Sequence, residues 1–305
     1  MELKCILGST TDGILAIDHT GKIIHFNRRF GQLWRIPQPL IDSKDDQTLL
    51  SYVVGQLADP QAFVSKVQAL YGSDLEATDI ISFKDGRAFE RFTSPLILGA
   101  SVIGRIWSFR DITERKQMED QIRQLAFYDP LTELPNRRLL LDRLSQALAE
   151  SKRSGRYGAL MFLDLDNFKA LNDTQGHAVG DLLLMQAAQR MKSCVREVDT
   201  VARFGGDEFV VLVGDLDADK VASTTQANNI AEKIRAALVT PYRLTVKHDG
   251  GADSTVEHQC SASIGAVVFT QREGSQDDFL KRADSAMYQA KEAGDNLIRF
   301  HDAKA

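Results

Sequence analysis

The sequence predicts an α+β protein with two domains: an N-terminal antiparallel sheet with helices, and a C-terminal sheet flanked by helices. Three observations support this class. The chain has 305 residues, which is long for a single core. Its apolar fraction of 43% and charged fraction of 26% are those of globular proteins. Near residue 111 the sequence becomes rich in charged residues and poor in apolar ones. We therefore expect domains at 1–111 and 129–305, joined by a helical linker at 112–128.

The first domain contains alternating apolar segments separated by turn residues, which is typical of β-hairpins. An Asp-Gly pair at 85–86 marks the second of two predicted turns. One segment instead has apolar residues at helical spacing and predicts a helix. The expected strands are Gly13–Ile17, Lys22–Phe26, Ile80–Phe83, Phe89–Thr93 and Ile103–Phe109, and the expected helix is Gln61–Tyr71.

The segment Asp111–Leu125 is rich in charge and predicts a helix. Met118, Ile122 and Leu125 follow each other at spacings of four and three, which suits the seam of a short coiled coil. The same pattern also fits a solvated helix that packs one stripe on its own domain. Three seam positions leave both interpretations open.

The second domain alternates helices and strands. A glycine pair lies between two apolar segments and predicts a tight hairpin. The expected strands are Ala159–Leu165, Thr200–Phe204, Phe209–Val213, two strands around the polar turn His248–Asp253, Ser261–Phe269 and Asn296–Phe300. The expected helices are Asp181–Val195, Asn229–Leu238 and Gln276–Ala293, the last ending at Gly294.

Composition excludes several classes of protein. The 37 basic and 42 acidic residues give a net charge of −5, whereas a protein that coats nucleic acid is basic. No apolar run approaches the roughly 18 residues of a membrane helix, and the N-terminus does not resemble a signal peptide. The three cysteines, Cys5, Cys194 and Cys260, are far apart and suit a reducing compartment. We therefore expect a cytoplasmic protein with neither nucleic acid nor membrane as a partner.

Carboxylates gather at two places in the second domain. Asp164 and Asp166 are two residues apart at the end of an apolar strand, and oxygen ligands there suit Mg²⁺ or Mn²⁺. Carboxylates also commonly end strands and cap helices, which is the better explanation for this pair alone. The turn Gly205-Gly206-Asp207-Glu208 shifts the balance, because its glycines permit close approach of a ligand and its acids can complete a metal site.

The string Gly205–Phe209 resembles the signature of the GGDEF family of diguanylate cyclases. Four further blocks appear in the family's order, at 129–138, 164–181, 263–265 and 287–291, so the resemblance covers about residues 122–302. It implies a nucleotidyl-cyclase, ferredoxin-like sheet. It also implies condensation of two GTP molecules into cyclic di-GMP with release of two pyrophosphates. Because the product has two-fold symmetry, the resemblance implies a homodimer.

The resemblance also implies roles for individual residues. Asp164, the carbonyl of Leu165, Asp207 and Glu208 would hold Mg²⁺ or Mn²⁺, and Asp207 would activate the attacking 3′-hydroxyl. The other matching positions would bind the nucleotide. Asn172 and Asp181 would read guanine, His177 would line the nucleotide, and Lys169, Arg203 and Lys291 would lie near phosphates.

The pair Arg196 and Asp199 forms an RxxD motif six residues before Gly205, a spacing that in this family marks a product-inhibition site. Two positions depart from the family pattern. Glu133 replaces a usual glycine, and we expect little effect. Asp295 places an anion where many members carry a cation, and we expect it to raise the Michaelis constant for GTP.

Residues 12–34, 85–92 and 103–116 resemble a PAS domain, with Asn27 and Phe30 at common positions of its first helix. This resemblance implies a sensor whose ligand is unknown. No cysteine stands in a flavin-adduct motif, so we reject blue-light sensing by that chemistry. His19 and His25 fit surface or structural roles better than haem ligation, and Trp34 and Trp107 fit the core.

The sequence therefore predicts a diguanylate cyclase regulated by its PAS domain and by its product. The alternative is a weakly catalytic or inactive module that binds GTP or cyclic di-GMP and regulates a partner. Asp295 favours that alternative, whereas the presence of Asp164, Asp207 and Glu208 argues against it.

Overall fold

The structure is a computed structural model that describes residues 10–43, 46–71, 73–99, 101–247, 253–270 and 274–301. Cys5 and most of the turn around 248–252 lie outside the described residues. The chain forms two compact units, Met1–Gln121 and Ile122–Ala305, and their boundary falls within helix α6, Thr113–Phe127. Among the described residues, no helix combines the length and hydropathy needed to cross a bilayer.

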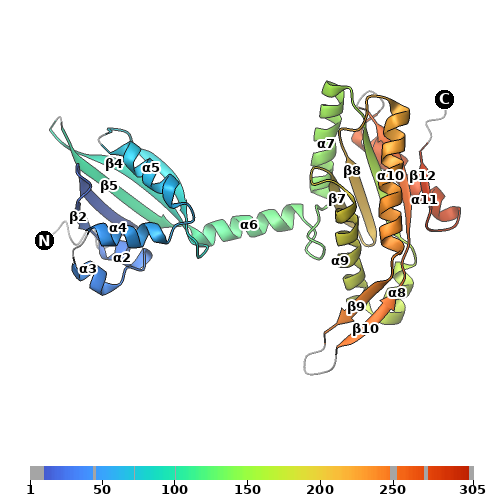
Figure 1. Ribbon diagram of the computed structural model, residues 1–305, viewed down its shortest axis with the longest axis horizontal. Coiled ribbons are helices and arrows are strands. Elements are labelled where there is room, and N and C mark those ends of the chain that lie inside the picture. The colour runs from blue at the N-terminus through green and yellow to red at the C-terminus, as the bar shows by residue number, and fades with distance from the viewer. Residues whose placement is uncertain are drawn as a thin grey trace. The chain divides into compact units, whose positions relative to one another are not determined.

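The N-terminal unit contains a five-stranded antiparallel sheet in the order β2-β1-β5-β4-β3 (Figure 1). The two predicted hairpins and the predicted last strand are all present. The strands are β1 Gly13–Asp18, β2 Ile23–Phe26, β3 Ala77–Ser82, β4 Ala88–Leu98 and β5 Ser101–Asp111. This sheet confirms the fold class expected for the first domain.

Four helices accompany this sheet: α2 Arg28–Leu33, α3 Gln38–Ser43, α4 Asp46–Gly55 and α5 Pro60–Leu70. The side chain of Asn27 caps α2 by accepting from the backbone N–H of Phe30, and it also accepts from the N–H of Ile14 at 2.9 Å. Trp34 and Trp107 are buried, as predicted. Helix α3 escaped prediction because its six residues are too few for a repeating apolar pattern, although Leu40 and Ile41 pack in part against the core.

The C-terminal unit has a five-stranded sheet in the order β12-β11-β6-β8-β7 and a separate hairpin of β9 and β10 (Figure 1). The strands are β6 Gly158–Leu165, β7 Thr200–Gly205, β8 Glu208–Val213, β9 Tyr242–Val246, β10 Ser254–His258, β11 Ala262–Phe269 and β12 Ile298–Phe300. Strand β6 is central and antiparallel to both of its neighbours, β8 and β11. All eight of its residues are buried, which explains why its sequence is free of polar side chains until Asp164.

Helices cover both faces of this sheet. The bounds are α7 Arg137–Ser154, α8 Phe168–Gln175, α9 His177–Cys194, α10 Lys220–Val239 and α11 Gln276–Glu292. Met161 and Leu163 of β6 pack in a core shared with α9 and α10. Leu160 and Phe162 point to the opposite core, which is shared with α7 and α11. The unit is therefore three layers deep, with β6 in the middle.

Two helices begin earlier than predicted. Helix α9 starts at His177 rather than Asp181, and α10 starts at Lys220 rather than at residue 229. The first half of α10 is rich in serine and threonine and buries small residues such as Ser223 and Ala227, which weakens its apolar signal. The side chain of Asp219 caps its N-terminus by accepting from the N–H of Ala222 at 2.8 Å.

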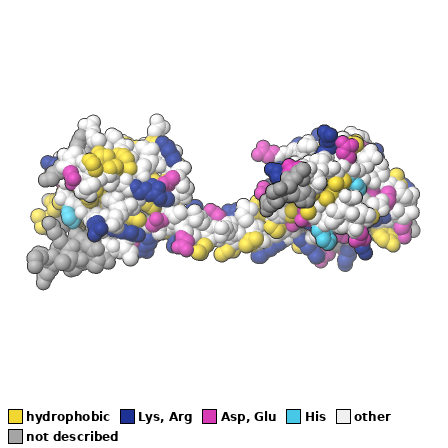
Figure 2. Space-filling view, turned by 90° about the horizontal axis from the view of Figure 1, so that it is seen from below, with side chains coloured by type: hydrophobic (Ala, Val, Ile, Leu, Met, Phe, Trp, Pro, Cys, Tyr) yellow, Lys and Arg dark blue, Asp and Glu magenta, His cyan; other side chains and the backbone are white. Residues whose placement is uncertain are grey.

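The predicted linker helix is present as α6. The three apolar residues of its predicted seam are exposed, Met118 by 51%, Ile122 by 66% and Leu125 by 72%. Hydrophobic side chains are visible along this helix (Figure 2). An apolar stripe this exposed is the kind of surface that a partner helix covers.

Candidate functional site

Two carboxylates lie opposite each other at one end of the central sheet. Asp164, the next-to-last residue of β6, pairs in register with Glu208, the first residue of β8. The turn that connects β7 to β8 contains Gly206, whose φ of +51° is a conformation that favours glycine. Asp207 follows it, and its carbonyl accepts a hydrogen bond from the N–H of Leu165 at 3.3 Å. The structure therefore places all four residues predicted to hold metal at the same end of the sheet.

The charges of this cluster repel each other. Burial raises the pKa of Asp164, and the nearby charge of Asp207 raises it further. Burial is also the main cause of the raised pKa of Glu208. The negative charges of Asp164, Asp284 and Asp207 raise that pKa further. One cation is close: the Nζ atom of Lys291 lies 2.6 Å from Oδ1 of Asp164. Burial by itself would lower the pKa of Lys291, but its contact with Asp164 gives a net increase.

The donor set fits a hard divalent cation in type and in charge. It offers carboxylate oxygens from two adjacent strands, β6 and β8, and from the turn that precedes β8. A cation would relieve the repulsion that contributes to their raised pKa values. In the part of the chain that the structure describes, no three histidine, cysteine, aspartate or glutamate side chains are grouped so as to hold a metal ion. Lys291 is the positive charge beside Asp164 in this arrangement.

Asp166 is buried beside this cluster and has a different environment. Its carboxylate accepts from the hydroxyl of Ser261 at 2.5 Å, from that of Ser263 at 2.7 Å and from the N–H of Asn296 at 3.0 Å. Ser263 is itself the register partner of Asp164 across β6 and β11. Asp166 therefore ties the end of β6 to β11 and to the turn that follows α11. Spacing placed Asp166 near Asp164 but gave no sign of this network.

The predicted guanine-reading residues lie on α8 and α9. Helix α8 starts three residues after Leu165, so it begins at the same end of β6 as Asp164. Oδ1 of Asn172 is buried without a hydrogen-bond partner among the described residues. It lies against Gly180, where an added Cβ would come within 1.9 Å of it. His177 and Asp181, both on α9, are exposed.

The three predicted phosphate-binding cations differ in their surroundings. Lys169 is exposed on α8, and Lys291 contacts Asp164 as described. Arg203 is largely buried, and both of its terminal nitrogens are engaged: Nη1 lies 3.1 Å from both oxygens of Asp129, and Nη2 donates to the carbonyl of Gly206 at 2.7 Å. Arg203 thus fastens the glycine turn to the loop before α7.

Asp129 is a residue that sequence reasoning left without a role. Burial would raise its pKa, but hydrogen bonds from Thr132 and Arg203 outweigh burial and lower it. Asp129 therefore stays charged and holds Arg203 in place. In the sequence, Asp129 is marked only as the first residue of the 129–138 motif. Its role becomes visible only in the fold, which places it in contact with Arg203.

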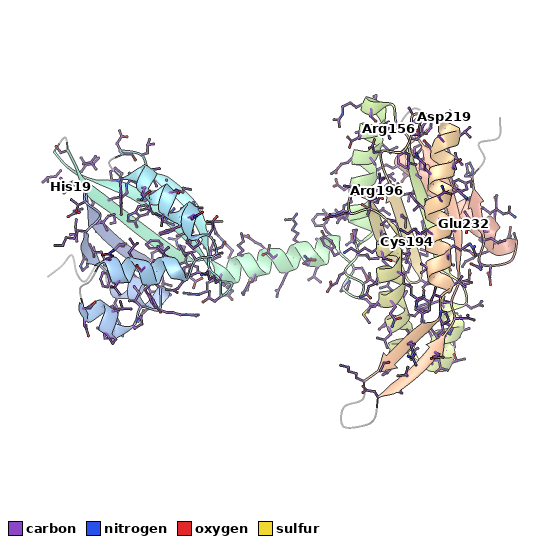
Figure 3. The ribbon with its side chains drawn as sticks, viewed as in Figure 1. His19, Arg156, Cys194, Arg196, Asp219 and Glu232 are labelled. Carbon is purple, nitrogen blue, oxygen red and sulfur yellow. The ribbon has the colours of Figure 1, made fainter. Side chains whose placement is uncertain are left out.

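The RxxD pair lies directly after α9 (Figure 3). The side chain of Asp199 is only 2% exposed, whereas that of Arg196 is 53% exposed. Arg196 donates to both oxygens of Asp199, at 3.1 and 3.0 Å, and to the carbonyl of Gly214 at 2.9 Å. A cavity of about 360 Å³ beside Asp199 is lined by α7 and by parts of β7 and β8. The guanidinium is thus fixed in orientation and still reaches solvent.

Asp295 is part of a tight turn after α11. Asp295 and Asn296 both have positive φ, 31° and 54°. Oδ2 of Asp295 accepts a weak hydrogen bond of 3.4 Å from the side chain of Asn167, which precedes α8. The anion therefore lies next to the segment that connects Asp166 to α8.

Comparisons with known proteins support this geometry. The family model described as "Diguanylate cyclase, GGDEF domain" matches residues 126–297. The chain is 42% identical over 180 residues to the bifunctional diguanylate cyclase/cyclic di-GMP phosphodiesterase MucR of Pseudomonas aeruginosa, an alignment that covers 59% of this chain and 24% of MucR. It is 41% identical over 166 residues to the diguanylate cyclase TpbB of the same species, covering 54% of this chain and 35% of TpbB. The chain thus spans only about a quarter to just over a third of the length of these curated relatives.

Solved structures give the same result. The GGDEF domain of TpbB matches with a TM-score of 0.50 and 39% identity, covering 57% of this chain and 94% of that one. The coiled coil and GGDEF domain of DgcB from Caulobacter crescentus, solved with cyclic di-GMP, matches with a TM-score of 0.52 and 27% identity, covering 62% of this chain and 93% of that one. Both matches, like the family model, concern the C-terminal unit with its paired carboxylates. The chain belongs to the GGDEF family of diguanylate cyclases.

Proposed function

We propose that this protein condenses two GTP molecules into cyclic di-GMP and releases two pyrophosphates. The observation that carries the proposal is the register pair Asp164 and Glu208, with Asp207 in the glycine turn between β7 and β8. This arrangement concentrates hard oxygen donors where a nucleotide triphosphate needs a divalent cation. The relatives named as diguanylate cyclases support the same reaction.

Each residue has a defined task in this proposal. Asp164, the carbonyl of Leu165, Asp207 and Glu208 would hold Mg²⁺ or Mn²⁺, and a cation bound there would neutralise charge on the phosphates. The carboxylate of Asp207 accepts the proton of the attacking 3′-hydroxyl. That oxygen then bonds to the α-phosphorus of the second GTP, and the bond to pyrophosphate breaks. Lys291 and Lys169 balance the charge of the leaving group.

Guanine is selected on α8 and α9. The carboxylate of Asp181 accepts from the N1–H and the exocyclic amine of guanine, an arrangement that adenine does not offer. The side chain of Asn172 reads the same base, and His177 lines the nucleotide. Arg203 acts by holding the glycine turn through Gly206 rather than as a free cation, given its bonds to Asp129.

The two-fold symmetry of the product requires two of these sites to face each other, so the active species is a homodimer. The exposed stripe of Met118, Ile122 and Leu125 supports pairing along α6. In this proposal the N-terminal unit is a PAS sensor that regulates how often the two sites meet. Arg196 and Asp199 bind the guanine edges of cyclic di-GMP and provide product inhibition. The DgcB structure with cyclic di-GMP supports binding of that ligand by this fold.

The decisive experiment incubates the purified protein with GTP and Mg²⁺ and analyses the products by mass spectrometry. We expect cyclic di-GMP from the natural sequence and none from Asp207→Ala. Absence of product with Mg²⁺ and with Mn²⁺, at high GTP, would refute the proposal for the isolated protein.

A second candidate is a module that binds GTP or cyclic di-GMP without turnover. It is favoured by two observations, the anion Asp295 beside the candidate site and the contact between Lys291 and Asp164. Calorimetry separates the two functions. Tight binding of GTP without product would support the module, whereas turnover would exclude it.

A further inference from the structure

The turn between α11 and β12 has an uncommon backbone. Gly294, Asp295 and Asn296 follow each other with φ values of +117°, +31° and +54°. Positive φ is uncommon outside glycine, and a run of such residues persists where neighbouring elements hold it in place. Other elements hydrogen-bond to this turn, residues 294–296, at both Asp295 and Asn296. The turn is therefore a junction between elements.

Asn296 is held from two directions. Its backbone N–H donates to Oδ2 of Asp166 at 3.0 Å, and its side-chain Oδ1 accepts from Nη1 of Arg235 on α10 at 3.1 Å. Arg235 is oriented in turn by Glu232 of the same helix (Figure 3), because its Nε donates to Oε2 of Glu232 at 2.9 Å. A line of three hydrogen bonds therefore runs from the surface of α10 through Asn296 to the buried carboxylate of Asp166.

This line ends beside the candidate metal site. Asp166 follows Asp164 by two residues, and it also accepts from Ser263, the register partner of Asp164. The same turn contacts the segment before α8, because Oδ2 of Asp295 accepts from the side chain of Asn167 at 3.4 Å. A shift of the 294–296 turn would therefore reach both the strand end that carries Asp164 and the start of α8.

Arg235 and Glu232 differ from an ordinary surface ion pair, which contributes little to stability. Arg153 and Glu150 on α7 have the same spacing, but their side chains are 78% and 67% exposed. The side chain of Arg235 is only 29% exposed, and it has Asn296 as an additional acceptor. Partial burial and a second hydrogen bond fix the orientation of its guanidinium, as positioning another group requires.

We propose that Arg235 is a positioning residue for the cyclase reaction. From α10 it holds the 294–296 turn through Asn296, and through that turn it fixes Asp166 and the strand end that carries Asp164. Without its hydrogen bond, Asn296 can turn, and the carboxylate of Asp166 is held less firmly. Arg235 contacts neither the substrate nor the metal in this role. The role rests on the proposed function and deepens it, because it assigns part of the affinity for the divalent cation to a residue outside the site.

Arg235→Met tests the proposal, because methionine keeps the apolar stem and removes the donors. The affinity of the full chain for Mn²⁺ alone, measured by electron paramagnetic resonance, should fall about fivefold, the effect of one lost hydrogen bond. The Mg²⁺ concentration for half-maximal turnover of GTP should rise by a similar factor. At saturating Mg²⁺, kcat should stay within about twofold of the natural value. Arg153→Met, which removes the matching arginine of α7, should change none of these quantities.

Asn296→Gly removes the acceptor at the other end of the same hydrogen bond. Glycine permits the positive φ and keeps the N–H that donates to Asp166. We expect this variant to lower the Mn²⁺ affinity as much as Arg235→Met does. The double variant should lower it no further, because both changes remove one interaction. Asn296→Gly also decides the test if Arg235→Met does not fold.

Hydrogen exchange tests the connection without metal or substrate. The amide of Asn296 should exchange faster in Arg235→Met than in the natural chain, because the turn opens more readily when its side chain is released. A purely structural role of Arg235 would lower the melting temperature and leave the Mn²⁺ affinity and the half-maximal Mg²⁺ concentration unchanged.

Several outcomes would overturn the proposal. Natural Mn²⁺ affinity and Mg²⁺ dependence in a folded variant that makes cyclic di-GMP would refute the role of Arg235 and leave the cyclase function intact. Additive losses in the double variant, or unchanged exchange at Asn296, would break the connection between the two residues. Should the natural chain convert GTP without measurable binding of Mn²⁺ alone, the half-maximal Mg²⁺ concentration decides. A natural chain that neither binds Mn²⁺ nor converts GTP refutes the proposed function itself, and the role of Arg235 with it.

Discussion

Asp164 and Glu208 face each other across the ladder of β6 and β8, and burial raises the pKa of both. The charge of Asp207 adds to this increase for Asp164, and the charge of Asp164 adds to it for Glu208. Each carboxyl binds its proton more tightly in the folded chain than in the unfolded chain. The contribution of these groups to the free energy of unfolding is therefore greatest near or below their unfolded pKa values. It declines as the pH rises through the folded values.

Glu208→Gln should consequently stabilise the metal-free protein at pH 7. We expect an increase of about 0.5–1 kcal/mol in the free energy of unfolding, typical of relieving strain at a functional site. The difference from the natural sequence should shrink toward pH 4, where the carboxyl of Glu208 becomes largely protonated in both the folded and the unfolded natural chain. Thermal unfolding in EDTA between pH 4 and 8 measures this. Added Mg²⁺ should stabilise the natural chain more than the variant, and a variant less stable at pH 7 would contradict the electrostatic argument.

Asp166→Asn should destabilise the end of β6, the strand that carries Asp164 and Leu165. One of the two oxygens would become an NH₂ donor. It would then face either the hydroxyl of Ser263 or the hydroxyl of Ser261 together with the N–H of Asn296, groups that now donate to Asp166, at a cost of about 1–3 kcal/mol. We also expect the Mg²⁺ concentration for half-maximal turnover to rise, because the strand end that carries Asp164 and Leu165 loses its anchor. Ser263→Ala is the milder comparison, with a loss of about 1 kcal/mol. A destabilised variant with unchanged Mg²⁺ dependence would reduce Asp166 to a purely structural residue.

Gly180→Ala should alter nucleotide selection more than stability. The new methyl group would clash with Oδ1 of Asn172, which is the end of a movable side chain, so the amide turns away. We expect the KM for GTP to rise by about tenfold and its advantage over ATP to shrink, the effect of one lost hydrogen bond to a base. Gly55→Ala, where an added Cβ meets nothing, serves as the control. Unchanged discrimination between GTP and ATP would exclude Asn172 as a guanine contact.

Arg196→Lys should relieve product inhibition. Lysine keeps the charge but loses the two-pronged contact that both Asp199 and a guanine edge require. Inhibition curves with added cyclic di-GMP should shift by about tenfold or more to higher concentration, while the initial rate is preserved. Arg153→Lys on the exposed surface of α7 is a matched control. Identical curves for the Arg196 variant and the natural chain would refute the inhibitory site.

Replacing Met118, Ile122 and Leu125 together by glutamate should abolish turnover without unfolding either unit. The charges would repel a second copy along the exposed stripe of α6. The triple replacement of Gln117, Gln121 and Gln124 by glutamate adds the same charge at the same spacing on a different face. We expect loss of the dimer by analytical ultracentrifugation in the first case only. If activity survives in the first variant, α6 is not the coupling element.

Secondary structure was predicted correctly from the sequence where the local residue pattern reflects the burial or the backbone conformation in the fold. Strand β6 is an apolar run because both of its faces are covered, and the turn at Gly206 needs a glycine conformation. It failed where the signal is weak or non-local. The first half of α10 packs small residues such as Ala227, and the role of Asp129 depends on Arg203, 74 positions later. The RxxD motif was legible in the sequence, but the fork between Arg196 and Asp199 depends on the fold.

Strand β5 occupies the middle of the N-terminal sheet and supplies Trp107 and Phe109 to the lining of a cavity of about 250 Å³ within the N-terminal unit. Helix α6 begins at Thr113, four residues after Phe109, and the hydroxyl of Thr113 hydrogen-bonds to both Ala88 of β4 and Asp111. A central strand has neighbours on both sides and cannot slide alone. Any displacement of β5 is therefore transmitted through the main chain to α6, and it does not depend on side-chain contacts.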